Sequence, residues 1–262
     1  MSASNSNPVI LTCEGGMATM TFNRPSAMNA LDVPTASAFL AACQSLADDP
    51  QLRVIVIRGE GRAFGVGGDL AALQHDSAAT AQDLIGRLHE AVVLLAGLNA
   101  PVIASLHGVV AGGSLSLSMA CDLVIAADST RFNLAYANVG ASCDVSGSWS
   151  LPRLVGLRNA MQIALLSETF DAAEALRLGL VNRVVPADKL QEETVALARR
   201  LAAGPTLAYG RMKRLMRQSF ETDLPTQLDA ERENFKASTQ TEDFKEAAKA
   251  FFAKRPAVFK GH

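Results

Sequence analysis

The chain has 262 residues, a formal net charge of −2 and an apolar fraction of 49%. This length suits one large domain or one domain with an appendage, and the small net charge excludes a general attraction to nucleic acid or anionic membranes. The four cysteines stand apart, with no C-x-x-C pair and no histidine cluster, which argues against zinc sites and disulfides and favours a reducing, cytoplasmic location.

The first part of the chain predicts strands that alternate with helices. Residues 9–13 and 17–22 predict a hairpin around "EGG", and a helix is expected from Pro34 to about Leu46. "RVIVIRG" predicts a buried strand that leads into the glycine-rich turn "EGRAFGVGGDL". A helix over 80–98 and a strand over 101–105 follow.

No membrane span or signal peptide is expected. In the most apolar stretch, "AVVLLAGLNAPVIASLHGVVAGG", Pro101 separates a helix from a strand, so no continuous apolar segment of about 20 residues remains. The first residues, "MSASNSNPVI", lack the basic and apolar regions of a signal peptide.

The same strand, turn and helix order repeats further along. The turn "GVVAGGS" leads into a helix that ends near Ala120, and the strand "CDLVIAA" and the short strand "TRFNL" follow. Helices are expected near 148–155, 159–167 and 172–178, then the strand "GLVNRVVP" and a charged helical stretch over 187–252. The pattern predicts an α/β protein, with a core over 1–200 and a helical C-terminal region over 201–262.

The two glycine-rich turns are candidate anion or oxyanion sites. Each follows a strand and precedes a helix, where backbone N–H groups have no partner. The first turn is not a dinucleotide motif, because Leu70 stands where G-x-G-x-x-G requires its last glycine. Taken singly, each turn is also explained by glycine's freedom to form a tight turn.

Asp144 is the only acidic residue between Asp128 and Glu168, and it lies in the segment "NVGASCDVSGSW". Two interpretations stay open. Aspartate favours the N-cap of a helix, here one that starts at Val145 or Ser146, but it also suits a general base in a pocket of small residues. His89 alone indicates only a surface or core histidine, and the absence of G-x-S-x-G argues against a serine hydrolase.

Several segments, taken together and in order, resemble the crotonase (enoyl-CoA hydratase/isomerase) family: "NRPSAMNAL", "RVIVIRGEGRAFGVGGDL", "APVIASLHGVVAGGSLSLSMACDLVIAAD", "LPRLVG", "EALRLGLVNRVVP" and "KRPAVF". The resemblance implies a crotonase-like spiral of ββα units with a C-terminal helical trimerisation region. It also implies a homotrimer or homohexamer, an acyl-CoA substrate, and no metal or other cofactor.

The resemblance also assigns roles to residues. It implies that the backbone N–H groups of Gly68 and Gly113 form an oxyanion hole, which stabilises negative charge on the thioester oxygen. Coenzyme A contacts are implied near the first turn and, from a neighbouring subunit, at the last helix: Arg24, Val66, Asp69, Leu70, Phe251 and Lys254.

The chain departs from the family's hydratases at two positions. Their two catalytic glutamates are replaced by Ser116 and Tyr136, so hydration by two acids is not expected. Asp144 matches an aspartate of dienoyl-CoA isomerases, of the 1,2-epoxyphenylacetyl-CoA isomerase type and of 4-chlorobenzoyl-CoA dehalogenase. The flanking "AYANVGASCDVSGSWSLPRLVG" is most similar to the epoxide isomerase type, whereas His89 falls at the dehalogenase's water-activating histidine.

We therefore expect an acyl-CoA isomerase in which Asp144 removes and returns a proton, with His89, Tyr136 and Ser116 in the substrate pocket. The enzymatic alternatives are an enoyl-CoA hydratase and a hydrolytic aryl-CoA dehalogenase, with Asp144 as nucleophile and His89 as water base in the latter. A non-catalytic acyl-CoA-binding scaffold is the alternative of another class. Nucleic-acid binding is not expected, because no basic, aromatic stretch is present.

Overall fold

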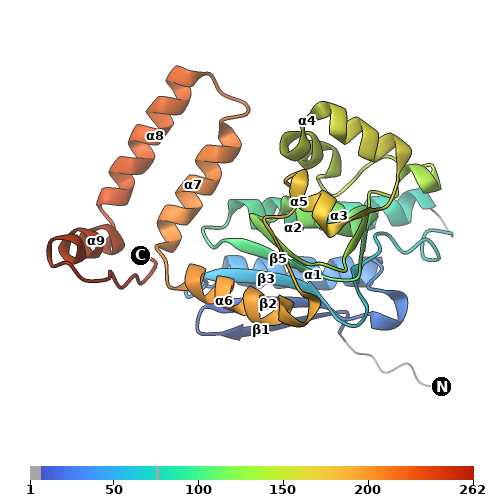
Figure 1. The fold of residues 1–262 in the computed structure, drawn as a ribbon, viewed down its shortest axis with the longest axis horizontal. Helices are drawn as coiled ribbons and strands as arrows, with labels where there is room; N and C mark the ends of the chain where they lie inside the picture. The colour runs from blue at the N-terminus through green and yellow to red at the C-terminus, as the bar shows by residue number, and fades with distance from the viewer. Residues whose placement is uncertain (1–6, 75–76) are drawn as a thin grey trace.

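A six-stranded sheet forms the base of the fold in the computed structural model, which describes residues 7–74 and 77–262 (Figure 1). Residues 1–6, part of the segment expected not to be a signal peptide, lie outside this range. The sheet order is β1-β2-β3-β5-β7-β10. The strands are Val9–Glu14, Met17–Phe22, Val54–Gly59, Val102–Leu106, Leu123–Ala127 and Arg183–Val185. β1 and β2 form the predicted antiparallel hairpin, and the other neighbours are parallel.

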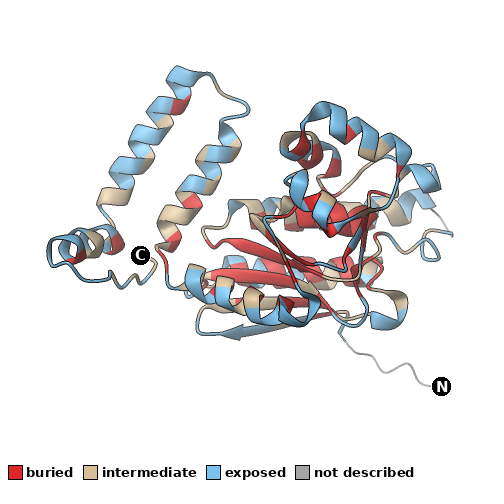
Figure 2. Cartoon of the chain, in the orientation of Figure 1, coloured by how far each residue is buried: buried red, intermediate tan, exposed pale blue. Residues whose placement is uncertain are grey.

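This sheet is buried on both faces, which explains the unbroken apolar run of β3. Ile55 and Ile57 point into the main hydrophobic cluster, whereas Val54 and Val56 join a second cluster with side chains of α6 (Leu190–Ala202). A parallel strand that helices cover on both faces is hydrophobic along its whole length. Figure 2 shows the buried strands at the centre of the molecule.

A second, four-stranded sheet was not predicted. It consists of β4 (Ala63–Gly65), β6 (Val109–Ala111), β8 (Arg131–Asn133) and β9 (Phe170–Asp171), and its first three strands are parallel. β4 and β6 lie within the two segments predicted as glycine-rich turns, and they were missed because three-residue strands next to glycines carry no alternating pattern. β8 corresponds to the predicted strand "TRFNL".

Successive units contribute one strand to each sheet and then a helix. β3 and β4 precede α2 (Ser77–Gly97), β5 and β6 precede α3 (Gly112–Ala120), and β7 and β8 precede α4 (Gly147–Leu166). This arrangement confirms the α/β spiral of ββα units that the resemblance implied. The two helices expected within 148–167 are also confirmed, since Gly156, with a φ of 76°, interrupts α4.

Two further helices complete the α/β part. α1 (Val33–Ala47) begins with Pro34 in its first turn, as predicted, and the Asp32 side chain caps it by accepting the N–H of Thr35 at 2.9 Å. α5 (Ala172–Arg177) confirms the helix expected over 172–178.

Three C-terminal helices extend away from the sheets (Figure 1): α7 (Thr206–Gln218), α8 (Leu224–Thr239) and α9 (Glu242–Phe252). Ion pairs hold α7 to the end of α3 and the start of β7. Asp122 pairs with Lys213 Nζ at 2.6 Å and with Arg217 at 2.9 Å. In the described part of the chain, no helix is long and apolar enough to cross a membrane.

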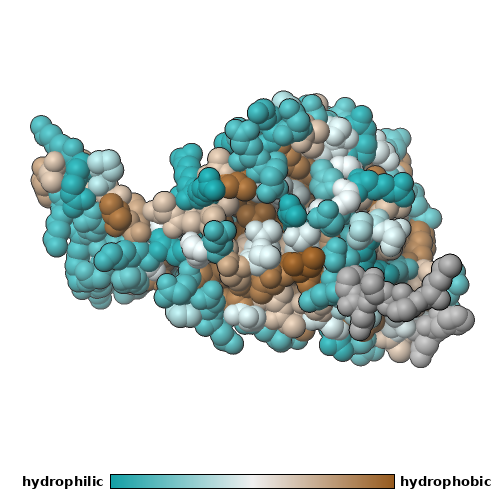
Figure 3. Space-filling view, turned by 90° about the horizontal axis from the view of Figure 1, so that it is seen from below, coloured by the Kyte–Doolittle hydropathy of each residue, from teal (hydrophilic) through white to brown (hydrophobic). Residues whose placement is uncertain are grey.

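The C-terminal helices expose many large apolar side chains. In Figure 3 these helices form a narrow lobe on which hydrophobic residues show between polar ones. Large exposed apolar areas mark interaction surfaces more often than free solvent-facing surface. The exposed residues on the three helices include Met212, Met216, Leu224, Leu228, Phe235 and Phe251.

Candidate active site

The two predicted glycine turns leave neighbouring parallel strands at the same edge of the second sheet. Val66–Gly68 follows β4, and Gly112–Gly113 follows β6, which pairs with β4. Because the carboxyl ends of parallel strands meet at one edge, the two turns come into contact. A Cβ on Gly67, whose φ is 88°, would lie only 3.0 Å from the nitrogen of Gly113.

Both candidate oxyanion donors have free N–H groups. Within the described ranges, the Gly68 N–H donates to no protein acceptor, although the residues on either side bond to Leu31 at 2.8 Å each. Gly113 is the second residue of α3, so its N–H precedes the first intrahelical hydrogen bond. The positive end of the α3 dipole adds to the attraction for an anionic oxygen at this place.

Ser114 connects the two turns, a role that was not predicted from the sequence. Its hydroxyl accepts the N–H of Gly67 at 3.1 Å, and its side chain is buried. Gly65 is required next to it, since a Cβ there would lie 2.4 Å from Ser114 Oγ. The serine of "AGGS" was the available signal, but a serine in the first turn of a helix usually indicates capping.

Asp144 faces Tyr136 and Ser116, the two residues that the resemblance places at the positions of the hydratase glutamates. The Tyr136 hydroxyl donates a short hydrogen bond to the Asp144 carboxylate, and Ser116 Oγ lies 3.0 Å from the same hydroxyl. Tyr136 follows β8, the third parallel strand of the second sheet, so it leaves that sheet at the same edge as the glycine turns. The Asp144 carboxylate is also close to Gly113, because a Cβ on that glycine would be 3.5 Å from Oδ1.

The interpretation of Asp144 as a helix cap is wrong. α4 starts at Gly147, its N-cap residue is Ser146, and no side chain caps it. Val145 and Ser146, with φ of 47° and 69°, turn the chain so that the carboxylate points away from α4. A left-handed backbone conformation costs a residue other than glycine about 1–2 kcal/mol. Packing that holds such strain in place is typical of functional sites.

Burial raises the pKa of Asp144, and the hydrogen bond from Tyr136 and the nearby His89 act in the opposite direction. The pKa of Tyr136 is raised, first by burial and then by the charge of Asp144. Tyr136 therefore stays protonated and donates, while Asp144 accepts. A half-buried carboxylate of this kind is a suitable general base.

Replacing Tyr136 with phenylalanine should shift the acid limb of the pH–kcat/KM profile to higher pH. The variant loses the hydrogen bond that lowers the pKa of Asp144, so a larger share of the carboxylate is protonated at a given pH. Among the described residues, His89 and the Cys143 thiol are the other titratable groups beside Asp144, and neither is altered. Ser116→Ala is the control, and equal profiles for Tyr136→Phe and wild type would contradict the expectation.

His89, on α2, contacts the backbone next to Asp144. Its Nε2 accepts the N–H of Val145 at 3.2 Å. The structure thus brings together Asp144, Tyr136, Ser116, His89 and Gly113 from four elements of the chain.

The residues implied in coenzyme A binding are placed in two groups. Val66, Asp69 and Leu70 surround Gly68, and the Leu70 side chain is 55% exposed. Phe251, 78% exposed, and Lys254 lie at the end of α9, which packs against α8.

Arg24, which the resemblance implied in coenzyme A binding, is held in ion pairs next to the first turn. Its guanidinium pairs with Asp32 and Asp69, both at 3.1 Å, and donates to the carbonyl of Ala30 at 2.5 Å. Two carboxylates offset its charge, so Arg24 serves to hold the loop that carries Gly68.

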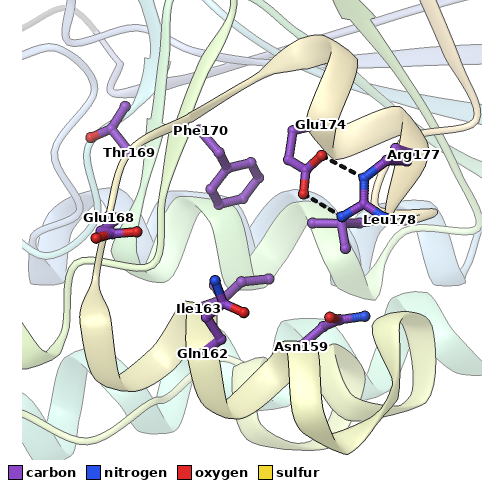
Figure 4. Close-up of a pocket in the computed structure, with 9 residues that line it drawn as sticks. All are labelled: Asn159, Gln162, Ile163, Glu168, Thr169, Phe170, Glu174, Arg177 and Leu178. Atoms are coloured by element: carbon purple, nitrogen blue, oxygen red, sulfur yellow. Dashed lines mark hydrogen bonds and ion pairs between the residues drawn. The ribbon is translucent and has the colours of Figure 1, made fainter.

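Two cavities lie elsewhere on the chain. One of about 250 Å³ is lined by residues of the second half of α4, β9 and α5, with the Glu174–Arg177 ion pair at its side (Figure 4). The other, about 610 Å³, is a largely apolar groove between α2, α4 and α7. None of the predicted site residues lines either of them.

The comparison with protein families matches residues 12–262 to the model described as enoyl-CoA hydratase/isomerase. The chain is 34% identical over 252 residues to 1,2-epoxyphenylacetyl-CoA isomerase of Escherichia coli, covering 95% of this chain and 96% of that protein. It is 35% identical over 253 residues to crotonyl-CoA hydratase of Syntrophomonas wolfei, covering 96% and 97%.

Two further similarities show the same range of activities. The chain is 33% identical over 258 residues to 4-chlorobenzoyl coenzyme A dehalogenase-2 of an Arthrobacter species, covering 97% of this chain and 94% of that one. A solved enoyl-CoA hydratase of Mycobacterium smegmatis superposes with a TM-score of 0.90 at 31% identity, covering 96% and 98%. The relatives thus include an isomerase, hydratases and a dehalogenase at similar identity.

Proposed function

Because the chain belongs to the enoyl-CoA hydratase/isomerase family and is an enzyme of acyl-CoA thioesters, we propose that it is an isomerase. Asp144 removes a proton from the acyl chain, and the Gly68 and Gly113 N–H groups stabilise the enolate oxygen. Asp144 then returns the proton to another carbon, which moves the double bond. These steps need no cofactor beyond the coenzyme A of the substrate.

The observation that supports isomerisation is the hydrogen-bonded pair of hydroxyls at the two glutamate positions. Ser116 and Tyr136 bond to each other, and Tyr136 bonds to Asp144. Among the residues that the structure describes, the site therefore presents one carboxylate rather than two, and no second acid accompanies it to hold and activate a water. One carboxylate is sufficient for a proton shift, since the same group acts as base and then as acid.

The acyl group is proposed to be of the type handled by 1,2-epoxyphenylacetyl-CoA isomerase. The segment 138–149, which carries Asp144, consists mainly of small residues, and such side chains would let a flat or bulky acyl group approach. The similarity over this segment and the 34% identity to that isomerase support this assignment.

The enzyme is proposed to work as a homotrimer or homohexamer. The exposed apolar side chains of α7, α8 and α9 favour burial against another subunit. Phe251 and Lys254, at the end of α9, are proposed to contact the coenzyme A bound to the neighbouring copy.

The fate of solvent oxygen tests the reaction type. The enzyme is incubated with a panel of enoyl-CoA and aryl-CoA thioesters in H₂¹⁸O, and the acyl products are analysed by mass spectrometry. Isomerisation gives a product of unchanged mass with a moved double bond. Incorporation of one ¹⁸O would instead show hydration or hydrolytic dehalogenation. Tight binding of every thioester without turnover would show a non-catalytic scaffold.

A further inference from the structure

We infer that His89 is a positioning residue, which fixes the turn that aims Asp144, rather than a base for water. The inference rests on the proposed role of Asp144. It is carried by the hydrogen bond from the Val145 N–H to His89 Nε2, because Val145 directly follows Asp144 and links it to α4.

The turn after Asp144 needs support from outside. Val145 and Ser146 both have left-handed backbone angles, with φ of 47° and 69°, and a β-branched residue such as valine is rarely found there. The Val145 side chain is fully buried, so the turn cannot relax by exposing it. Ser146, the N-cap residue of α4, gives no side-chain capping bond that would compensate.

His89 supplies this support from a different element of the fold. It lies on α2, whereas the turn precedes α4, and its Nε2 is the hydrogen-bond partner of the Val145 N–H. With Tyr136 holding the carboxylate itself, Asp144 is fixed at its side chain and at the following peptide. Two contacts from separate elements therefore determine where the carboxylate faces.

The same hydrogen bond engages one nitrogen of the ring. As the acceptor of the Val145 N–H, Nε2 directs its lone pair at the backbone of the turn. The lone pair of Nε2 is then occupied by the protein and is not available to remove a proton from water. This differs from the role that the resemblance to the dehalogenase implied for His89.

Two substitutions separate the positioning role from a base role. In His89→Gln, the amide oxygen can take the place of Nε2 and accept the Val145 N–H, but an amide cannot act as a base. In His89→Leu, the volume is similar and no acceptor remains. His89 is exposed, so both variants should fold, and thermal unfolding checks this. His107→Gln, a histidine that bonds to the Gly61 carbonyl at 2.9 Å, is the matched control.

Steady-state kinetics on the thioester that shows the fastest isomerisation give the readout. We expect His89→Gln to keep kcat within about threefold of wild type. His89→Leu should lose about 10- to 100-fold in kcat with little change in KM, since a misplacement of about 1 Å can cost about 10²-fold. Wild-type kcat in His89→Leu would overturn the inference, and so would equal, large losses in both variants.

The outcome is separable from that of the proposed function. If the wild-type product carries no ¹⁸O but His89→Leu is fully active, the isomerase stands and the positioning role fails. If the product carries ¹⁸O and both variants are inactive, His89 acts on water, and both proposals fail.

Discussion

Replacing Asp144 with asparagine is expected to lower kcat for the double-bond shift by about 10²- to 10⁴-fold, the usual contribution of a general acid–base group. Asparagine has the same shape and can still accept the hydrogen bond from Tyr136, so the surrounding structure should stay intact. It cannot take up or return a proton. Stopped-flow absorbance of the conjugated thioester measures the rate.

Asp171→Asn is the matched control for this substitution. Asp171 is a carboxylate that does cap a helix, since it accepts the N–H of Glu174 at 2.9 Å at the start of α5. Asparagine caps a helix about as well as aspartate, so kcat should not change. If the Asp144→Asn variant kept kcat within threefold of wild type, Asp144 would not be the acid–base group of the mechanism.

Replacing Gly113 with proline should lower kcat by about 10²- to 10³-fold, the cost of one oxyanion donor. Proline is tolerated in the first turn of a helix, where no intrahelical bond depends on its missing N–H. Gly112 precedes it and has no side chain to clash with the ring. The substitution therefore removes the donor and places the ring Cδ where the N–H pointed, while α3 can still form.

Gly113→Ala controls for the added side chain. A Cβ at this position would meet Asp144 Oδ1 at 3.5 Å and Leu31 at 3.6 Å, which are ordinary contact distances. The alanine variant keeps its N–H and should lose much less activity than the proline variant. Circular dichroism and thermal unfolding report whether both variants are folded. Equal kcat values in two folded variants would mean that the Gly113 N–H does not take part.

The sequence predicted the first sheet and most helices because those elements are long and carry clear patterns. Buried strands such as β3 are continuous apolar runs, and α1 starts with a capping aspartate and a proline. β4 and β6 could not be predicted, since each has three residues and lies next to glycines. Yet these two strands bring Gly68 and Gly113 close to each other. That the two glycines lie together could therefore be expected only from the resemblance.

The contacts around Asp144 also could not be predicted from the sequence. Nothing in the spacing of Ser116, Tyr136 and Asp144 indicates that the three side chains meet, because they come from α3, the loop after β8 and the turn before α4. Arg24 shows the opposite case. The resemblance implied a coenzyme A contact for it, but the sequence does not show that its guanidinium pairs with Asp32 and Asp69, which lie 8 and 45 residues further along the chain.

A crystal structure with a bound, unreactive thioester analogue would test the central claim most directly. We expect its carbonyl oxygen to accept hydrogen bonds from both Gly68 and Gly113, at about 2.7–3.1 Å, with an Asp144 oxygen in contact with the α or γ carbon. A carbonyl oxygen bound to neither amide, or an Asp144 carboxylate separated from the acyl chain by the Tyr136 ring, would contradict it.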